Sequence, residues 1–250
     1  MAAKTEVLTQ PDYGIDAPHE MKRLFWRGGT TFALGLGLFI MNRAEAPGPA
    51  VALFSVLGLI GAGLAAAGYV RYWSSKVAKV RYRDQILDAI PWRGDEKVLD
   101  AGCGRGLMAI GAAKRLKTGK VTGIDIWSTD ELSGNSGESA MANAKAEGVA
   151  DKIRVENGDM RRLPYPPNSY DVVLSSLAVH NLGEALDRDK ALLEMWRVLK
   201  PGGHLALFDV AHTGDYLATL QGSGAEIVAK SGTLFLWCVP TRWFVARKAQ

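Results

Sequence analysis

The sequence predicts a doubly wound, mostly parallel α/β sheet that is preceded by a transmembrane α-helical hairpin. Three observations lead to this fold class. Two uncharged apolar runs lie within the first third of the 250 residues. From residue 95 onward, short β-rich apolar runs alternate with helical patterns, as is typical of a parallel sheet covered on both faces. A glycine turn, Gly102-Cys103-Gly104-Arg105-Gly106, follows the first of these runs.

The apolar pattern divides the chain into four segments. We expect an N-terminal segment over residues 1–23, a transmembrane hairpin over 24–71, a basic amphipathic connecting helix over 72–94 and the α/β domain over 95–250. A chain of this length has room for one full α/β domain and a smaller unit.

The second apolar run is the stronger of the two candidate membrane spans. Residues 50–70 carry no charge, and at about 1.5 Å per residue they cover the roughly 30 Å of a bilayer core. The first run, 28–42, is shorter, and extending it back through residues 24–26 requires Arg27 to snorkel to the interface. The intervening Glu45-Ala46-Pro47-Gly48-Pro49 predicts a tight turn.

Three other interpretations of these runs stay open. A signal peptide would not be followed by a second, longer apolar segment. A hairpin buried in a soluble domain is possible, and so is a single span beside a re-entrant first segment. Small residues along the second run permit close helix packing, either of the hairpin on itself or between two copies in a homodimer: Gly58, Gly61, Ala62, Ala65 and Ala66.

Basic residues lie at both outer ends of the hairpin, whereas the turn between the helices has only Arg43, offset by Glu45. The flanking residues are Lys22, Arg23 and Arg27 before it, and Arg71, Lys76, Lys79, Arg81 and Arg83 after it. The positive-inside rule then predicts a multi-pass protein of the cell (inner) membrane, with both termini and the α/β domain cytoplasmic.

Residues 72–90 form a basic amphipathic pattern between the hairpin and the domain. One interpretation is a helix lying on the anionic cytoplasmic surface of the membrane. The other is an ordinary first helix of the domain with a solvated charged face. Each interpretation could hold for one end of the segment.

The domain is expected to have a Rossmann-like sheet that ends in an antiparallel strand pair. The candidate parallel strands are 97–101, 120–126, 153–157, 170–176 and 204–210, and the helices between them are 107–116, 136–147 and 187–199. The antiparallel pair is expected from residues 225–230 and from 234–239 followed by 243–247. Ligands of such sheets bind at the carboxyl ends of the strands.

The glycine turn follows a strand that ends with an acidic residue, Asp100. Gly102, Gly104 and Gly106 let the backbone turn sharply and let a ligand lie against the main chain. A carboxylate at this place would repel the pyrophosphate of a dinucleotide, and the third glycine of the dinucleotide motif would fall at Leu107. The turn therefore predicts a cationic, phosphate-free nucleoside.

Two further strand ends carry suitable groups. Asp125 can accept hydrogen bonds from ribose hydroxyls, and Ile126 or Trp127 can lie against a base. Asp159 offers a carboxylate to an exocyclic amine, and Met160 offers a thioether to a base face. Each residue alone could be a turn cap, but three acids in this order and spacing are a stronger signal.

Residues from about 95 to 210 resemble the class I S-adenosylmethionine-dependent methyltransferases. The motifs that carry the resemblance are Val98–Gly106, Gly123–Ile126, Gly158–Met160, Tyr170–Ser176 and Arg197–Leu205. The resemblance implies S-adenosyl-L-methionine as cofactor, with Asp100 and the glycine turn at its methionine end, Asp125 at the ribose, and Asp159 with Met160 at the adenine. It also implies that the segment beginning at Ser176 borders the transferred methyl group. It does not cover residues 1–90.

Candidate groups for the methyl acceptor follow the fourth and fifth strands. His180 is a candidate general base, or else it caps the following turn. His212 is a second candidate base, Tyr216 and Asn181 are candidate substrate contacts, and Asp209 is a candidate to orient a histidine. The amino-acceptor signature Asn/Asp-Pro-Pro-Tyr/Phe is absent, since Ser175-Ser176-Leu177-Ala178 stands in its place. Small molecules, lipids, quinones and thiols remain open as acceptors.

Composition narrows the function classes further. With only Cys103 and Cys238 there is no disulfide framework, and a reducing compartment is the simpler interpretation. We expect Cys103 to be a small residue in a tight turn rather than a reactive thiol, and we expect no metal. The net charge of +4 is too weak to argue for nucleic acid.

The first hypothesis is therefore a membrane-anchored methyltransferase acting on a small or lipophilic acceptor at the cytoplasmic face. The acceptor would be a phospholipid amine, a quinone precursor or a thiol. The alternatives are a membrane-tethered S-adenosylmethionine-binding module without turnover, and a nucleic-acid or protein methyltransferase.

Overall fold

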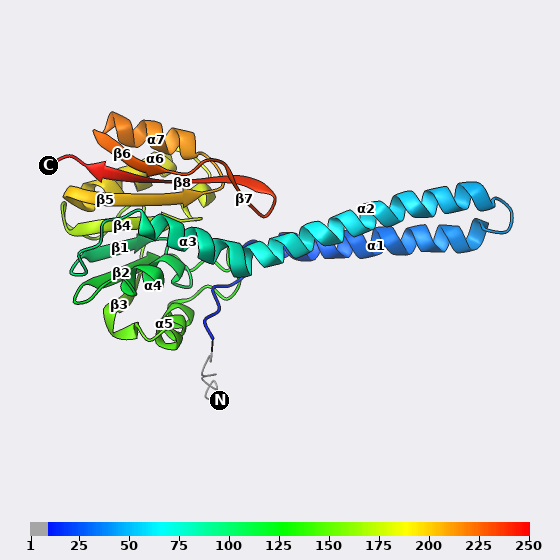
Figure 1. Ribbon diagram of the computed structural model, residues 1–250, viewed down its shortest axis with the longest axis horizontal. Helices are drawn as coiled ribbons and strands as arrows, with labels where there is room; N and C mark the ends of the chain where they lie inside the picture. Colours follow the sequence, from blue (N-terminus) through cyan, green and yellow to red (C-terminus); the bar gives the residue numbers. More distant parts are fainter. Residues whose placement is uncertain (1–9) are drawn as a thin grey trace.

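The computed structural model describes residues 10–250 and consists of an α/β domain from which a long helical hairpin projects (Figure 1). The sheet has the strand order β3-β2-β1-β4-β5-β8-β6, and β7 pairs with β8 beside it. Its parallel strands are β1 Lys97–Ala101, β2 Lys120–Asp125, β3 Ile153–Asn157, β4 Tyr170–Ser176 and β5 Leu199–Asp209. The remaining strands are β6 Ala225–Lys230, β7 Leu234–Leu236 and β8 Val239–Lys248, and β8 runs antiparallel to β5 and β6.

Helices cover both faces of the sheet. One hydrophobic cluster joins one face to α3 Lys79–Asp88, α4 Leu107–Ala113 and α5 Gly137–Ala146. A second cluster joins the other face to α6 Ala185–Val198 and α7 Thr213–Gly222. The predicted doubly wound, mostly parallel sheet with antiparallel strands near the C-terminus is therefore confirmed.

Most predicted elements are found at or close to the expected residues, with two differences. The fifth strand begins at Leu199 rather than at residue 204, because the chain before the Pro201-Gly202-Gly203 segment already pairs with β4 through Leu199 and Tyr170. Helix α7 was not expected. Its sequence has a glycine near each end, and its helix packs on the core through Tyr216 and Leu220, four residues apart.

The hairpin consists of α1 Pro18–Asn42 and α2 Pro47–Trp73, which pack closely along their length. A Cβ on Gly61 would lie 2.8 Å from the carbonyl oxygen of Gly28, and a Cβ on Gly35 would lie 2.8 Å from Cβ of Leu57. These glycines are therefore used for packing of the hairpin on itself. Gly58, by contrast, has open space around it.

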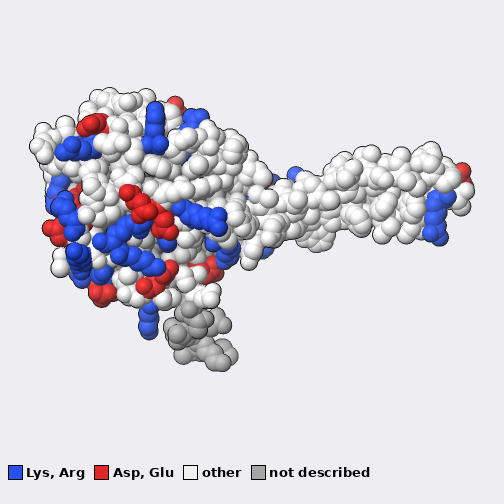
Figure 2. All heavy atoms as spheres, in the orientation of Figure 1, with Lys and Arg blue, Asp and Glu red and all other residues white. Residues whose placement is uncertain are grey.

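The outer surface of the hairpin is apolar and uncovered. Trp26 is 74% exposed, Leu59 75% and Met41 77%. The space-filling view shows an almost uncharged rod with charged residues at its tip (Figure 2). By length and composition both helices could cross a membrane, and only 11% of each apolar stretch is buried. The alternative of a hairpin buried in a soluble domain does not describe this structure.

Helix α1 begins at Pro18, before the residue 24 at which the hairpin is expected to start, and the described residues before it pack on the domain. Tyr13 is 7% exposed and lies in the core, where its hydroxyl donates to Glu147 at 3.0 Å. Asn143 donates to the carbonyl oxygen of Asp12 at 2.8 Å. Residues 12–17, which we call the strap, therefore cross the surface of the domain before entering the hairpin.

The segment 72–94, interpreted either as a membrane-surface helix or as the first helix of the domain, continues the hairpin without a break. Helix α2 continues through a π-helical turn, Ser74–Ala78, directly into α3. Lys79 and Arg83, which the sequence pattern placed on an exposed basic face, are only 2% and 6% exposed. Lys79 donates to the carbonyl oxygen of Tyr13 at 2.9 Å and pairs with Asp16 at 3.0 Å. These partners replace solvent, so the buried face of α3 agrees with the interpretation as the first helix of the domain.

Candidate functional site

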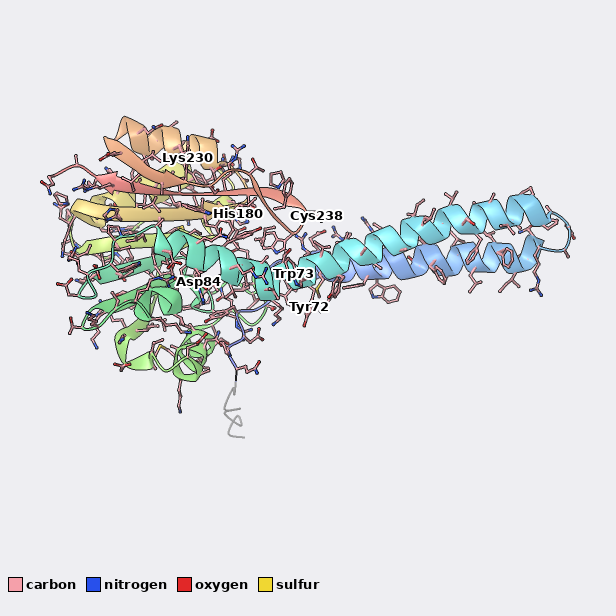
Figure 3. The ribbon with its side chains drawn as sticks, viewed as in Figure 1. Tyr72, Trp73, Asp84, His180, Lys230 and Cys238 are labelled. Atoms are coloured by element: carbon pink, nitrogen blue, oxygen red, sulfur yellow. The ribbon has the colours of Figure 1, made fainter. Side chains whose placement is uncertain are left out.

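A cavity of about 420 Å³ lies at the carboxyl ends of β1, β2 and β4, next to the base of the hairpin. We call it the central cavity. Its wall combines the glycine turn, the strap, the loop 130–135, residues 176–181 and the hairpin base. Figure 3 shows His180 on the side of the domain that carries the hairpin, and Trp73 and Cys238 at the junction between the two.

The glycine turn forms one side of the central cavity. Gly102 has φ +75°, and a Cβ there would lie 2.4 Å from Cβ of Ala178, so no other residue fits without strain. Asp100 Oδ2 accepts the N–H of Ala109 at 2.8 Å, whereas its Oδ1 is buried without a partner. Gly106, the third glycine, precedes α4 with φ +86° and does not line the cavity.

The electrostatics of this side favour a cation. Burial, opposed by the hydrogen bond from Ala109 and aided by the neighbouring Asp125 carboxylate, raises the pKa of Asp100 to about 7. A cationic group beside Oδ1 would stabilise the ionised form. The orphaned oxygen therefore fits an ammonium group, in keeping with the cationic, phosphate-free nucleoside that the glycine turn predicts and with the S-adenosylmethionine that the family resemblance implies.

Asp125, at the end of β2, holds the turn in place. It accepts the N–H groups of Gly104 at 2.8 Å and Trp127 at 2.6 Å, and the side-chain amide of Asn135 at 3.2 Å. Asn135 was missed, since only its place directly before Ser136, the N-cap of α5, marks it in the sequence. Its Oδ1 is buried without a partner and can accept a ribose hydroxyl.

Buried polar atoms without a hydrogen-bond partner gather around the central cavity. In the described part of the chain, six residues of its wall carry such an atom: Arg71 (Nε), Asp100 (Oδ1), Arg105 (Nε), Asn135 (Oδ1), Ser176 (Oγ) and His180 (Nδ1), the last of which contacts Asp209 as an ion pair. Buried polar groups in proteins are normally satisfied. This concentration indicates a cavity built for a polar ligand.

Besides Gly106, four predicted cofactor residues lie outside the wall of the central cavity. Ile126 is 61% exposed, and Trp127 packs near Gly137. Met160 contacts the glycine turn, with Cε 2.8 Å from where a Cβ on Gly102 would lie. The carboxylate of Asp159 is bound by Arg161 at 2.6 Å, so it is not free for an amine.

His180 is held at the cavity by Asp209. The Nδ1 of His180 lies 2.5 Å from Asp209 Oδ1, and the backbone N–H of His180 donates to Asp209 Oδ2 at 3.0 Å. Burial alone would lower the pKa of His180, but Asp209, with smaller contributions from Glu131 and Asp16, raises it above its usual value. With Nδ1 engaged, Nε2 is the ring nitrogen available to a substrate.

The other predicted acceptor residues divide into two groups. Asn181 lines the cavity, where its amide donates to Glu131 at 2.9 Å. Tyr216 does not reach the cavity, because its ring is buried and its hydroxyl lies 3.4 Å from Asp209. His212 begins α7 with a left-handed φ of 58° and pairs with Asp215 at 3.4 Å, away from the cavity wall. Cys103 is buried inside the glycine turn, as expected of a small packing residue.

Comparison with known proteins assigns the domain. The family profile described as a methyltransferase domain matches residues 99–207. These residues form a methyltransferase domain. The 27-O-demethylrifamycin SV methyltransferase of Amycolatopsis mediterranei is 34% identical over 167 residues, which are 64% of this chain and 54% of that protein. The demethylmenaquinone methyltransferase of Lactiplantibacillus plantarum is 31% identical over 157 residues, 62% of each chain.

The chain spans about half of the length of the curated relatives it matches, such as the rifamycin enzyme. The methyltransferase domain also superposes on solved structures. A geranyl diphosphate methyltransferase in complex with SAM has a TM-score of 0.56 at 14% identity, covering 73% of this chain and 91% of that one. A [4+2]-cyclase, SpnF, reaches 0.57 at 20% identity, with 70% and 82% covered. At these identities the likeness concerns the fold, and S-adenosylmethionine is the cofactor that the domain family uses.

Proposed function

We propose that this protein is a membrane-anchored, S-adenosylmethionine-dependent methyltransferase that acts on a small lipophilic acceptor at the cytoplasmic membrane face. The observation that carries the proposal is the position of the central cavity. Its cation-binding carboxylate, Asp100, and its histidine, His180, share one cavity with residues at the base of an exposed apolar hairpin, Ala17 and Arg71.

On the donor side, Asp100 would hold the ammonium group, and Asp125 with Asn135 would hold the ribose hydroxyls. The bound cofactor supplies a methyl group on a sulfonium for in-line displacement. Positioning can therefore account for much of the rate. Ser176 and the glycine turn would fix the orientation of that group toward the end of β4.

On the acceptor side, His180 is the candidate general base. A base is required when the nucleophile carries a proton at working pH, and the Asp209–His180 pair has the geometry to accept one at Nε2. Relatives named as demethylmenaquinone methyltransferase and as ubiquinone/menaquinone biosynthesis C-methyltransferase support a quinone precursor as the acceptor class. A phospholipid amine or a thiol is chemically compatible with the same site.

The membrane anchor is supported by exposure and charge. An apolar surface of this length needs a second apolar phase, and a signal sequence does not account for α2, which begins only at Pro47. Lys22, Arg23 and Arg27 at the domain end of α1 favour a cytoplasmic domain.

Isothermal titration calorimetry with S-adenosylmethionine tests the donor half. Asp125→Ala and Gly104→Val should abolish detectable binding while circular dichroism stays unchanged, because the first releases the turn and the second places a side chain at φ +52° beside Leu132. Asp215→Ala, on the exposed side of α7, is the matched control and should bind normally. Wild-type protein that did not bind S-adenosylmethionine would refute the proposed function.

A further inference from the structure

Arg71 lies in the last turn of α2 and lines the central cavity. Its guanidinium carbon is 5.4 Å from the centre of the Trp237 ring, and its Nε is buried without a hydrogen-bond partner. Within residues 10–250 no carboxylate lies within ion-pair distance of it. The side chain as a whole is half-buried, but the Nε is shielded from solvent, and an unpaired buried polar group is costly, so its place at the cavity wall points to a ligand.

The other two cations of the cavity wall are already engaged. Lys79 pairs with Asp16 at 3.0 Å and donates to backbone carbonyls of the strap. Arg105 pairs with Asp12 at 3.5 Å and donates to the carbonyl oxygen of Ser133 at 3.0 Å. Among the cations of the cavity wall in the described part of the chain, Arg71 is thus the one that makes no ion pair and keeps its charge for a ligand.

Arg71 lies on the acceptor side of the cavity. Trp237 belongs to the turn between β7 and β8, and β8 pairs with β5, whose last residue is Asp209. The groups that fit the cofactor stand at the ends of β1 and β2, on the other side of β4 in the sheet.

The stacked ring is itself fixed. The backbone N–H of Trp237 donates to Ser74 and its indole N–H donates to Ser75, both at 3.2 Å. Arg71 therefore lies against a ring that two hydrogen bonds hold in place.

An apolar surface continues from this point along the hairpin. The side chains beside Arg71 at the end of α2 are exposed: Tyr69, Val70, Tyr72 and Trp73. Aromatic residues at such a junction are typical of a membrane–water interface. An amphiphile whose head lay at Arg71 would have its tail against these side chains.

We propose that the methyl acceptor is an amphiphile with an oxyanion head group, and that Arg71 binds this oxyanion while the apolar tail lies at the hairpin base. The inference rests on the proposed function and adds the substrate class. A guanidinium fork matches phosphate and carboxylate oxygens bidentately, and such charge-assisted hydrogen bonds are strong when sheltered from water.

Calorimetry on the full chain in phosphatidylcholine nanodiscs, saturated with S-adenosylhomocysteine, tests this inference. The probes are monododecyl phosphate, dodecanoate, inorganic phosphate and neutral dodecyl maltoside. Wild type should bind the two dodecyl anions, and Arg71→Gln should bind them at least tenfold more weakly. Arg71→Lys should be intermediate, because it keeps the charge and loses the fork. Arg43→Gln, at the distal tip, is the matched control.

Several results would overturn the assignment. Equal binding of the dodecyl anions by wild type and Arg71→Gln would mean that they only partition into the disc. Inorganic phosphate that bound as tightly as dodecyl phosphate would make free phosphate the ligand. An equal loss of S-adenosylhomocysteine affinity in Arg71→Gln would assign Arg71 to the cofactor's carboxylate. Failure of wild type to bind S-adenosylhomocysteine would instead refute the proposed function itself.

Discussion

The methyltransferase domain and the hairpin use the same apolar residue types in opposite ways. In the sheet, Leu174 and Val173 are fully buried between two helical layers, whereas Leu59 on α2 and Trp26 on α1 are about three-quarters exposed. A pair of helices can cover only the narrow stripe where they touch, and here glycines occupy that stripe. The larger apolar residues of the hairpin are not covered by protein and need another apolar phase, which we propose is the bilayer.

The two regions differ as much in polar groups. The hairpin between its ends is nearly free of charge, whereas the domain gathers acids, bases and unpartnered polar atoms around one cavity. Under the proposed function, anchoring and chemistry are separated along the chain and meet at the strap and at the end of α2.

The largest effect is expected at His180. His180→Ala should lower kcat by about 10²- to 10⁴-fold, because the nucleophile loses its proton acceptor, while S-adenosylmethionine affinity should change little. The rate of wild type should fall as the pH drops below the raised pKa of His180, since a protonated imidazole cannot accept a proton. Asp209→Asn should move this acid limb to lower pH. An unchanged kcat in His180→Ala would show that His180 is not the general base.

The next test compares the same leucine-to-alanine substitution in the core of the domain and on the surface of the hairpin. Leu174→Ala should lower the free energy of unfolding by about 2–5 kcal/mol, because it leaves a cavity in the core. Leu59→Ala should change it by less than about 0.5 kcal/mol in detergent, because no protein packs on that side chain. Chemical denaturation measures both. Similar losses would mean that the hairpin surface is covered by protein.

A charge introduced on the hairpin tests whether α2 crosses the membrane. Leu59→Arg should raise the apparent free energy of inserting α2 by about 2.5–3.5 kcal/mol, as measured by glycosylation mapping in microsomes. Leu59→Met is the matched control. If both variants inserted like wild type, α2 would not be a transmembrane span.

The smallest expected effect comes from Asp100. Because its pKa is raised to about 7, the carboxylate is protonated below that pH and loses its attraction for a cation. S-adenosylhomocysteine, which carries an ammonium group, should therefore bind about tenfold more weakly at pH 6 than at pH 8. Calorimetry at the two pH values measures this, and Asp100→Asn should bind weakly at both. A wild-type affinity independent of pH would contradict the role of Asp100.

The strand ends could be located from the sequence because carboxyl ends of parallel strands share one edge of a sheet. Asp100 and Asp125 therefore lie together as expected. The ion pair of Asp159 with Arg161, two residues along, could not be predicted from the strand pattern, and the role of Asp159 toward an amine stays a prediction. His180 could be proposed, but its Asp209 partner depends on how β4 and β5 pair.

The rest of the cavity wall depends on docking between distant segments. Tyr13 and Asp16 reach the cavity because the strap binds Lys79 and the loop 130–135, contacts that no periodicity reveals. For the same reason the basic residues of α3 seemed exposed in the sequence, although strap carbonyls and carboxylates surround Lys79. The role that we propose for Arg71 likewise depends on a contact between distant segments, because Trp237 in the turn between β7 and β8 lies against α2.

The central claim is that the cavity transfers a methyl group to a lipophilic acceptor at the base of the hairpin. The most direct test incubates the full chain in proteoliposomes with trideuteromethyl S-adenosylmethionine and a membrane lipid extract, followed by mass spectrometry. We expect a mass increase of one labelled methyl group on a lipid-soluble species, absent in Asp125→Ala. Label confined to water-soluble species or protein, or no label from a preparation that binds the cofactor, would contradict the account.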